Sequence, residues 1–225
     1  MKEIFSSPFF GISLCIFAYQ IGIYINKKVG SPLANPMLIA ISIIIGFLKI
    51  FNIPYDSFNQ GGKIITLLLV PATACLGVSI YKQFELLKKN IIPIILGCTV
   101  GSLSSVGTVY ALCKLFKLDE KLTASLIPKS VTTPIAIGIT QQHGGIVPIT
   151  VVAVLITGLV GAIFAPYMIR FFRIKNSVAA GIAIGTSSHA LGTSKAIEIG
   201  EVEGAMSSLA IGISGIITVL FAMFL

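Results

Sequence analysis

A lysine and several hydroxyl groups lie between two prolines in an otherwise apolar stretch, residues 124–138. The polar members are Lys129, Ser130, Thr132 and Thr133, and the prolines are Pro128 and Pro134. Proline removes a backbone hydrogen bond from a helix. In lipid an unpaired backbone group is costly, so such a break persists only where protein or a water-filled cavity surrounds it. A lysine at membrane depth is also costly, and by default it marks a pathway or a binding site.

The chemistry that this segment favours is carboxylate binding. A helix N-terminus exposes backbone N–H groups with partial positive charge, and hydroxyl groups and Lys129 add further donors. Pro128 and Pro134 are therefore predicted helix breaks, and the four polar residues are predicted substrate-binding residues. The alternative is that Lys129 snorkels to an interface or pairs with a carbonyl group.

A second polar stretch occupies residues 185–195, again inside an apolar segment. Gly185 and Gly192 permit unwinding and are predicted helix breaks, and Ser188, His189 and Thr193 are predicted substrate-binding residues. His189 could bind an anion when protonated or take up a coupling proton. The residues equally support the alternative, in which His189 is a buried neutral histidine that hydrogen-bonds to a neighbouring helix. His143 is predicted to be a loop residue.

Two weaker signals are Asn35-Pro36 and the Pro71 segment, residues 71–77. Each is either another helix break beside the same cavity or an ordinary kink, and a kink is favoured.

The residues that are missing narrow the chemistry further. Acidic residues occur only in loops or at segment ends, whereas proton pumps and cation carriers commonly use a carboxylate in the membrane core. The inventory thus favours an anionic or neutral solute. No acid is placed to orient His189 beside Ser188, no nucleotide-binding loop is present, and the four cysteines lack metal spacing, so we expect neither an enzyme nor a cofactor or metal.

The elements that must position these residues are membrane helices. The 225 residues are 55% hydrophobic and 11% charged, far from the roughly 25% charge of a soluble domain. We predict an all-α integral membrane protein with about seven or eight transmembrane segments, including broken or re-entrant helices. The expected segments are 8–25, 32–50, 64–81, 91–113, 122–139, 146–169, 178–196 and 205–225. They form one polytopic domain, residues 1–225, because no length remains for a soluble domain.

Charge and internal similarity suggest two inverted repeats, with halves 1–113 and 122–225. When the sequence is aligned with itself at an offset of 115 residues, Leu76-Gly77 matches Leu191-Gly192. This match is equally compatible with chance in a glycine-rich chain. The net charge of +8 resides mainly in short loops, which fits topology and lipid headgroups better than nucleic acid. If residues 128–134 enter the membrane and return to the same side without crossing it, the basic loops 27–28, 82–89 and 170–175 all face the cytoplasm.

The chain resembles the LrgB/CidB family of antiholin-like membrane proteins over nearly its whole length. The most specific matches are residues 127–136 and 188–196, supported by residues 35–40 and 71–74. The family pattern has a further proline where this chain has Ser79.

This resemblance implies a multi-pass protein of the bacterial cytoplasmic membrane that works with a small LrgA/CidA-like holin-like partner. It also implies a link to murein hydrolase control and cell lysis, and a carrier role for small carboxylates such as pyruvate and glycolate. The expected partners are therefore the holin-like protein, the solute and the lipid bilayer; a homo-oligomer is compatible with the sequence. The rival hypothesis is a non-transporting modulator of a holin-like pore, in which the polar breaks are packing features.

Overall fold

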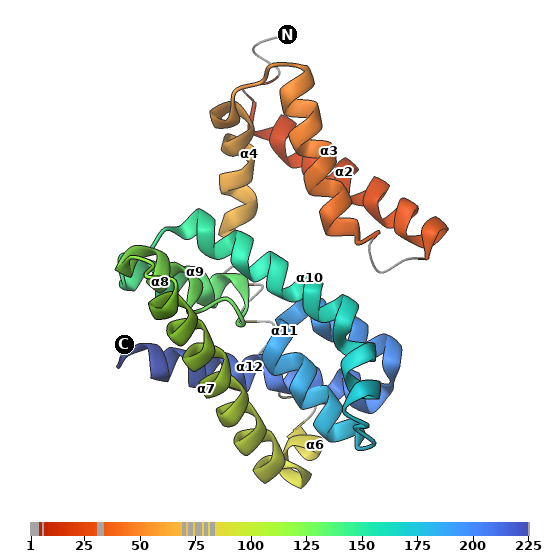
Figure 1. Ribbon diagram of the computed structural model, residues 1–225. Coiled ribbons are helices and arrows are strands. Elements are labelled where there is room, and N and C mark those ends of the chain that lie inside the picture. Colours follow the sequence, from red (N-terminus) through yellow and green to blue (C-terminus); the bar gives the residue numbers. More distant parts are fainter. Residues whose placement is uncertain are drawn as a thin grey trace. The chain divides into compact units, whose positions relative to one another are not determined.

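The computed structural model describes residues 5, 7–30, 34–68, 71, 74, 78, 81 and 84–224, and every regular element in that part is a helix (Figure 1). The chain divides into two compact units, residues 1–72 and 73–225, which are described separately. The helices are α2 (Pro8–Val29), α3 (Pro36–Ile50), α4 (Tyr55–Leu67), α6 (Phe84–Lys89), α7 (Ile91–Leu115), α8 (Glu120–Leu126), α9 (Thr133–Gln142), α10 (Val147–Phe171), α11 (Ser177–Ile199) and α12 (Glu201–Ala222).

Four of these helices, α2, α7, α10 and α12, are long and apolar enough to cross a bilayer. Each has 22 or 25 residues, and a helix needs about 20 apolar residues to span the hydrocarbon core. The all-helical membrane class that the sequence predicts is confirmed.

In the described part of the first unit, helices α2, α3 and α4 are held together by close backbone contacts. Gly22 of α2 packs against Pro36, and Phe10 stacks on Phe47 with ring centroids 6.1 Å apart, so α2 and α3 run antiparallel. Gly11 packs against Gly61 of α4. A side chain at either glycine would overlap the opposing backbone, and small residues are the usual means of close helix approach in membranes.

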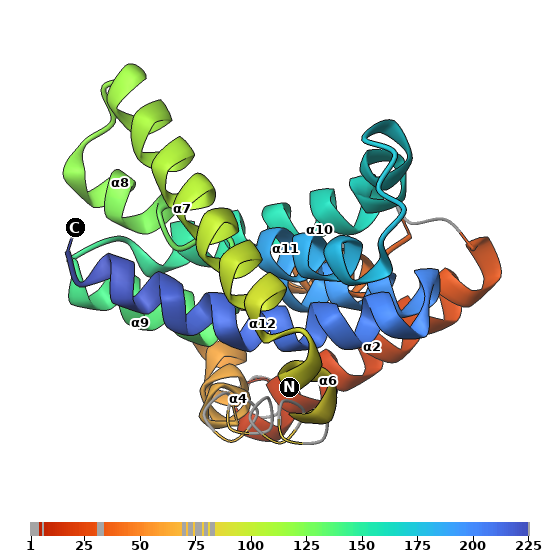
Figure 2. The ribbon, with the colours of Figure 1, turned by 90° about the horizontal axis from the view of Figure 1, so that it is seen from below.

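The second unit contains α7 and α12 side by side and parallel. Cys98 contacts Ala210, and Ser102 donates a hydrogen bond to the Ser214 carbonyl four residues further along both helices. Figure 2 shows α12 running through this unit towards the C-terminus, with α7 lying against it. Ile94, Met206 and Leu209 are fully buried in the core between them.

Between α7 and α10, the chain forms a helical hairpin, which we call hairpin 1 (residues 120–142). Helix α8 ends at Leu126 and α9 begins at Thr133, so residues 127–132 are the tip. Lys114 at the end of α7, Glu120 at the start of α8 and His143 after α9 all line one small pocket. Hairpin 1 therefore starts and ends at the C-terminal end of α7.

A buried hydroxyl network holds hairpin 1 against α10. Thr140 and Thr150 share a hydrogen bond of 2.8 Å, and Thr150 also donates to the Ser125 carbonyl over 2.9 Å. All three residues are fully buried. Each hydroxyl thus finds a partner in a region where an unpaired polar group would be costly.

Helix α11 is also a hairpin, which we call hairpin 2 (residues 177–199). The backbone leaves the helical region at His189, where φ is 41° and ψ is −140°. Gly185 and Thr193 both contact Ser207 of α12, although they lie four residues on either side of His189. Gly181 and Ile197 likewise both pack against the first turn of α12. In a straight helix those two residues would be about 24 Å apart.

One helix begins earlier than the expected segments. Helix α4 begins at Tyr55, whereas the sequence analysis places a polar connection before Ile64; Gly61 lets this mixed segment pack on α2. Half of the predicted segment 64–81 lies outside the described residues; Pro71 itself is exposed and in a helical conformation.

Candidate functional site

The tips of the two hairpins converge at the middle of the second unit. Ser130 at tip 1 accepts a hydrogen bond of 2.8 Å from Ser105, which lies near the centre of α7. Val131 of the same tip packs against Val154 of α10. At tip 2, Nε2 of His189 lies 2.9 Å from the carbonyl oxygen of that same Val154. Two segments about 60 residues apart thus meet around one turn of α10.

Tip 1 presents a cation that has no carboxylate partner. Lys129 Nζ donates a hydrogen bond to Ser130 Oγ over 3.0 Å, and neither ion pair found among the described residues involves this lysine. An ammonium group has three donors and no acceptor. Lys129 therefore has donors to spare at the middle of the unit.

Ser130 extends this set of donors. Its Oγ accepts from both Lys129 and Ser105, so both lone pairs of the hydroxyl oxygen are engaged. The remaining hydroxyl proton can only be donated, and donation is strengthened by the charged neighbour. Lys129 and Ser130 together favour a ligand that accepts hydrogen bonds and carries negative charge.

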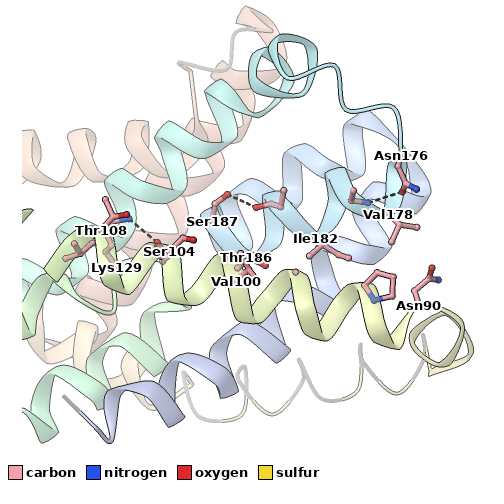
Figure 3. A pocket seen from close by; sticks show the side chains of 18 of the residues that line it. Asn90, Val100, Ser104, Thr108, Lys129, Asn176, Val178, Ile182, Thr186 and Ser187 are labelled. Atoms are coloured by element: carbon pink, nitrogen blue, oxygen red, sulfur yellow. Dashed lines mark hydrogen bonds between the residues drawn. The ribbon is translucent and has the colours of Figure 1, made fainter. Parts of the chain in front are cut away.

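Lys129 and Ser130 face a groove of about 820 Å³ between α7 and the first half of hairpin 2. Figure 3 shows Lys129 beside Ser104 and Thr108 at one end and Asn90 with Asn176 at the other. The residues that line the groove are Asn90, Pro93, Gly97, Val100, Gly101, Ser104, Ser105, Thr108, Val109, Leu112, Lys129, Ser130, Asn176, Val178, Ala179, Ile182, Ala183, Thr186 and Ser187. A cavity of this size, mainly apolar with a few placed polar groups, is typical of small-molecule sites.

The start of α9 adds positive partial charge to tip 1. Thr132 is the N-cap residue of α9, Thr133 is its first residue and Pro134 follows in the first turn. Thr132 is buried, and its Oγ1 finds no hydrogen-bond partner among the described residues. Neither threonine lines the groove, so neither of these predicted binding residues contacts it directly.

Tip 2 is packed instead of open. His189 is 4% exposed and Ser188 is 3% exposed, and neither lines the groove. Thr193 donates to the His189 carbonyl and shares a hydrogen bond of 2.7 Å with Ser207. Two glycines of α10 make room for the tip, since a side chain at Gly158 or Gly161 would overlap His189 or Ser188.

Of the residues predicted from the sequence, Lys129 and Ser130 therefore meet in the groove, whereas Ser188, His189 and Thr193 lie in the packing of tip 2. The sequence analysis missed the hydroxyls that α7 contributes, Ser104, Ser105 and Thr108. Their spacing of three and four residues on an apolar helix is the signal that places them on one face.

Four of the predicted helix breaks lie within helical turns or at the start of a helix. Hairpin 2 turns at His189, and Gly185 and Gly192 lie within helical turns, where each is close-packed: Gly185 against Ser207 and Gly192 against Ser188. Asn35 and Pro36 begin α3 and do not interrupt it. Asn35 caps the helix by accepting a hydrogen bond from the Met37 N–H over 2.9 Å, and proline is well suited to the first helical position.

Within the described residues, no group of three or more His, Cys, Asp or Glu side chains could hold a metal ion. The groove offers one ammonium group, hydroxyl groups, two amide side chains and apolar walls.

Comparison with known proteins identifies the family. The sequence pattern of the LrgB-like family matches residues 15–225. The chain belongs to the LrgB-like family. It is 40% identical to antiholin-like protein LrgB of Bacillus subtilis over 215 residues, which cover 95% of this chain and 93% of the relative.

Other relatives extend the similarity within the LrgB-like family. Antiholin-like protein LrgB of Bacillus mycoides is 39% identical over 214 residues, or 95% of this chain and 93% of the relative. The uncharacterized protein YwbG of Bacillus subtilis is 40% identical over 191 residues, or 85% of each chain. No solved structure matches this LrgB-like protein significantly.

Proposed function

We propose that this protein is a membrane carrier of small monocarboxylates, with pyruvate and glycolate as representative solutes. The observation that supports it is the Lys129–Ser130 pair, to which Ser105 donates: its free hydrogen-bonding groups are all donors, and it forms no ion pair with a carboxylate among the described residues. The ammonium of Lys129 neutralises the carboxylate, and the Ser130 hydroxyl donates to it.

The helix arrangement supports a carrier more than a static partner. In the proposed topology, α7, α10 and α12 cross the membrane, and hairpins 1 and 2 are re-entrant. Hairpin 1 starts and ends at the C-terminal end of α7, whereas Asn176, just before hairpin 2, lies beside Asn90 at the N-terminal end. Helix breaks that meet near mid-membrane from opposite sides are a common architecture of secondary transporters.

The same arrangement orients the protein. Lys88 and Lys89 precede α7, and Arg170, Arg173 and Lys175 precede Asn176. These basic loops adjoin one end of the groove, and by the positive-inside rule that end faces the cytoplasm of a bacterial plasma membrane. The inverted-repeat hypothesis, with halves 1–113 and 122–225, stays part of this proposal.

The second candidate function is modulation of a holin-like pore, together with control of murein hydrolase activity and lysis. The name of the relatives, antiholin-like protein, favours it. Under this candidate an LrgA/CidA-like partner binds the lipid-facing helices, and Lys129 has no role in binding a solute.

Uptake into liposomes tests the two candidates against each other. Purified protein, alone and with its holin-like partner, is reconstituted and supplied with labelled pyruvate or glycolate. We expect saturable uptake that is lost in Lys129→Ala and retained in Lys121→Ala, a matched removal of one exposed lysine from the base of hairpin 1. Folded wild type that transports neither solute, with or without the partner, would overturn the carrier proposal in favour of pore modulation.

A further inference from the structure

The polarity of the groove walls indicates which chemical groups the substrate has beyond the carboxylate that Lys129 would bind. On α7, hydroxyl groups line the groove at Thr108 and Ser104 beside Lys129, and the next residue of the same face is Val100. One turn of helix separates Ser104 from Val100, about 5.4 Å along the axis. The wall thus changes from polar to apolar within one turn of the cation.

The opposite wall changes in the same way, about one turn further from the cation. On hairpin 2, Thr186 and Ser187 line the groove near tip 1, and Ala183, Ile182 and Val178 follow towards Asn176. Thr186 packs beside Gly101, next to Val100, and Ile182 packs beside Gly97 one turn away, so both walls are apolar from the level of Ile182 onwards. Figure 3 shows Thr186, Ile182 and Val178 in this order between Lys129 and Asn90.

Charge in the groove is confined to one group. Among the described residues, Lys129 is the single ionisable residue that lines it, and none of those lining residues is acidic. A second carboxylate on the ligand would therefore lie against Val100 and Ile182 with nothing to neutralise it, which is expensive away from water. The groove suits an anion that carries a single charge at one end.

The volume of about 820 Å³ also exceeds what a three-carbon acid fills. Pockets that hold drug-sized ligands span about 300–1,000 Å³. A pyruvate bound at Lys129 would leave the stretch from Val100 to Asn90 without ligand contact.

Resting on the carrier function proposed above, we propose that the groove selects 2-oxo and 2-hydroxy monocarboxylates with an apolar side chain longer than that of pyruvate. The carboxylate binds Lys129 and Ser130, and the oxygen on the second carbon meets the hydroxyls of Ser104 and Thr108. The alkyl chain lies between Val100 of α7 and the Ile182–Ala183 wall of hairpin 2. Dicarboxylates are excluded by the apolar wall.

The test is direct binding, measured by calorimetric titration of purified protein with straight-chain 2-oxo acids of increasing length. Burying a methylene group contributes enough free energy to raise affinity about fourfold when burial is complete, so we expect about two- to fourfold per carbon beyond pyruvate until the groove is filled. A 2-oxo dicarboxylate should bind at least about tenfold more weakly than the monocarboxylate of equal length.

Matched variants locate the effect. Val100→Asn should flatten the dependence on chain length, whereas Leu103→Asn, an exposed residue of α7 outside the groove, should leave that dependence unchanged. Ala183→Phe, which fills the groove, should weaken the long acids more than pyruvate. Lys129→Met in the same detergent should remove the chain-length dependence, which separates site binding from partition into the micelle.

The outcomes distinguish this inference from the carrier function. Chain-length dependence that persists in Lys129→Met, or equal affinity for all lengths in wild type, overturns the inference while pyruvate uptake still supports the carrier. Length-dependent, Lys129-dependent binding without uptake supports the inference and overturns the carrier function. Absence of binding by every 2-oxo acid overturns the inference.

Discussion

Hairpins 1 and 2 have similar geometry, yet their tips differ in what they leave unsatisfied. At tip 1, Lys129 and Ser130 line the groove and retain free donors. At tip 2, His189 and Thr193 are buried, and Nε2 of His189 and Oγ1 of Thr193 are hydrogen-bonded within the protein. The difference indicates that tip 1 binds the solute and that tip 2 supports the wall against which it binds.

Substitution of Lys129 is expected to have the largest effect on transport and little on stability. Removing one partner of a desolvated charge pair costs about 2–5 kcal/mol, so Lys129→Met should lower uptake at low substrate concentration at least about 30-fold. Replacing an unpaired buried charge by an apolar side chain of similar size should not lower the unfolding temperature. Proteoliposome uptake and thermal loss of the monodisperse chromatography peak measure the two quantities.

A Lys129→Met protein that unfolds at a clearly lower temperature would contradict the distinction between the two tips, because tip 1 would then serve packing as tip 2 does. Lys121→Met provides the control for loss of one positive charge.

Substitution of His189 should have the opposite pattern. His189→Ala removes the contact with the Val154 carbonyl and leaves a cavity, a loss of about 2–4 kcal/mol in the free energy of unfolding. The positive φ at this residue is strained for any side chain, at a cost of about 1–3 kcal/mol. His189→Gly relieves that strain, so its unfolding temperature should lie above that of His189→Ala.

Transport separates support from binding at this position. In both His189 variants that remain folded, the half-saturating pyruvate concentration should stay within about threefold of wild type, which corresponds to less than about 1 kcal/mol. A much larger shift together with an unchanged unfolding temperature would place His189 in the binding site.

The glycines test whether hairpin 2 depends on close approach more than hairpin 1 does. Gly185→Ala would place a methyl group against the Ser207 carbonyl of the α12 backbone, which cannot move aside as a side chain can. Overpacking of this kind costs about 1–3 kcal/mol. Gly138 of α9 has open space around it, so Gly138→Ala should be neutral or slightly stabilising in the same thermal assay. Equal effects of the two substitutions would remove this difference between the hairpins.

What the sequence could predict follows from how local each signal is. Pro128 and Pro134 act on their own turns, so a break between them could be placed, and the helix ends at Leu126 and begins again at Thr133. The turn at His189 could not be placed by the same means, because non-glycine residues rarely adopt a positive φ, and the enrichment of histidine there is mostly in the left-handed helical region, far from the ψ of −140° at His189. Gly185 and Gly192 on either side of the turn are predicted helix breaks, but they serve as close-packing positions, Gly185 against α12 and Gly192 against Ser188 within the hairpin.

Long-range partners were beyond the sequence for a related reason. Ser105 lies on a helix rich in small residues, and such residues usually serve helix packing. Its contact with Ser130 spans 25 residues and exists only because hairpin 1 returns to the centre of α7. Composition alone, in contrast, predicted the all-helical membrane class, since that depends on the sum of many residues.

Ser105 provides the finest test of the comparison, because it acts on tip 1 through another residue. Ser105→Ala removes the donor to Ser130 Oγ, which frees a lone pair on Ser130 and lets its hydroxyl rotate away from the ligand. A neutral hydrogen bond contributes about 0.5–1.5 kcal/mol, so the half-saturating concentration should rise about two- to tenfold with the maximal rate nearly unchanged.

Ser104→Ala, one residue away and also in the groove, probes direct contact with the solute. In Ser130→Ala the effect of Ser105→Ala should vanish, because the two residues act as one unit, and double-variant kinetics measure that coupling. Additive losses would mean that Ser105 contacts the solute itself.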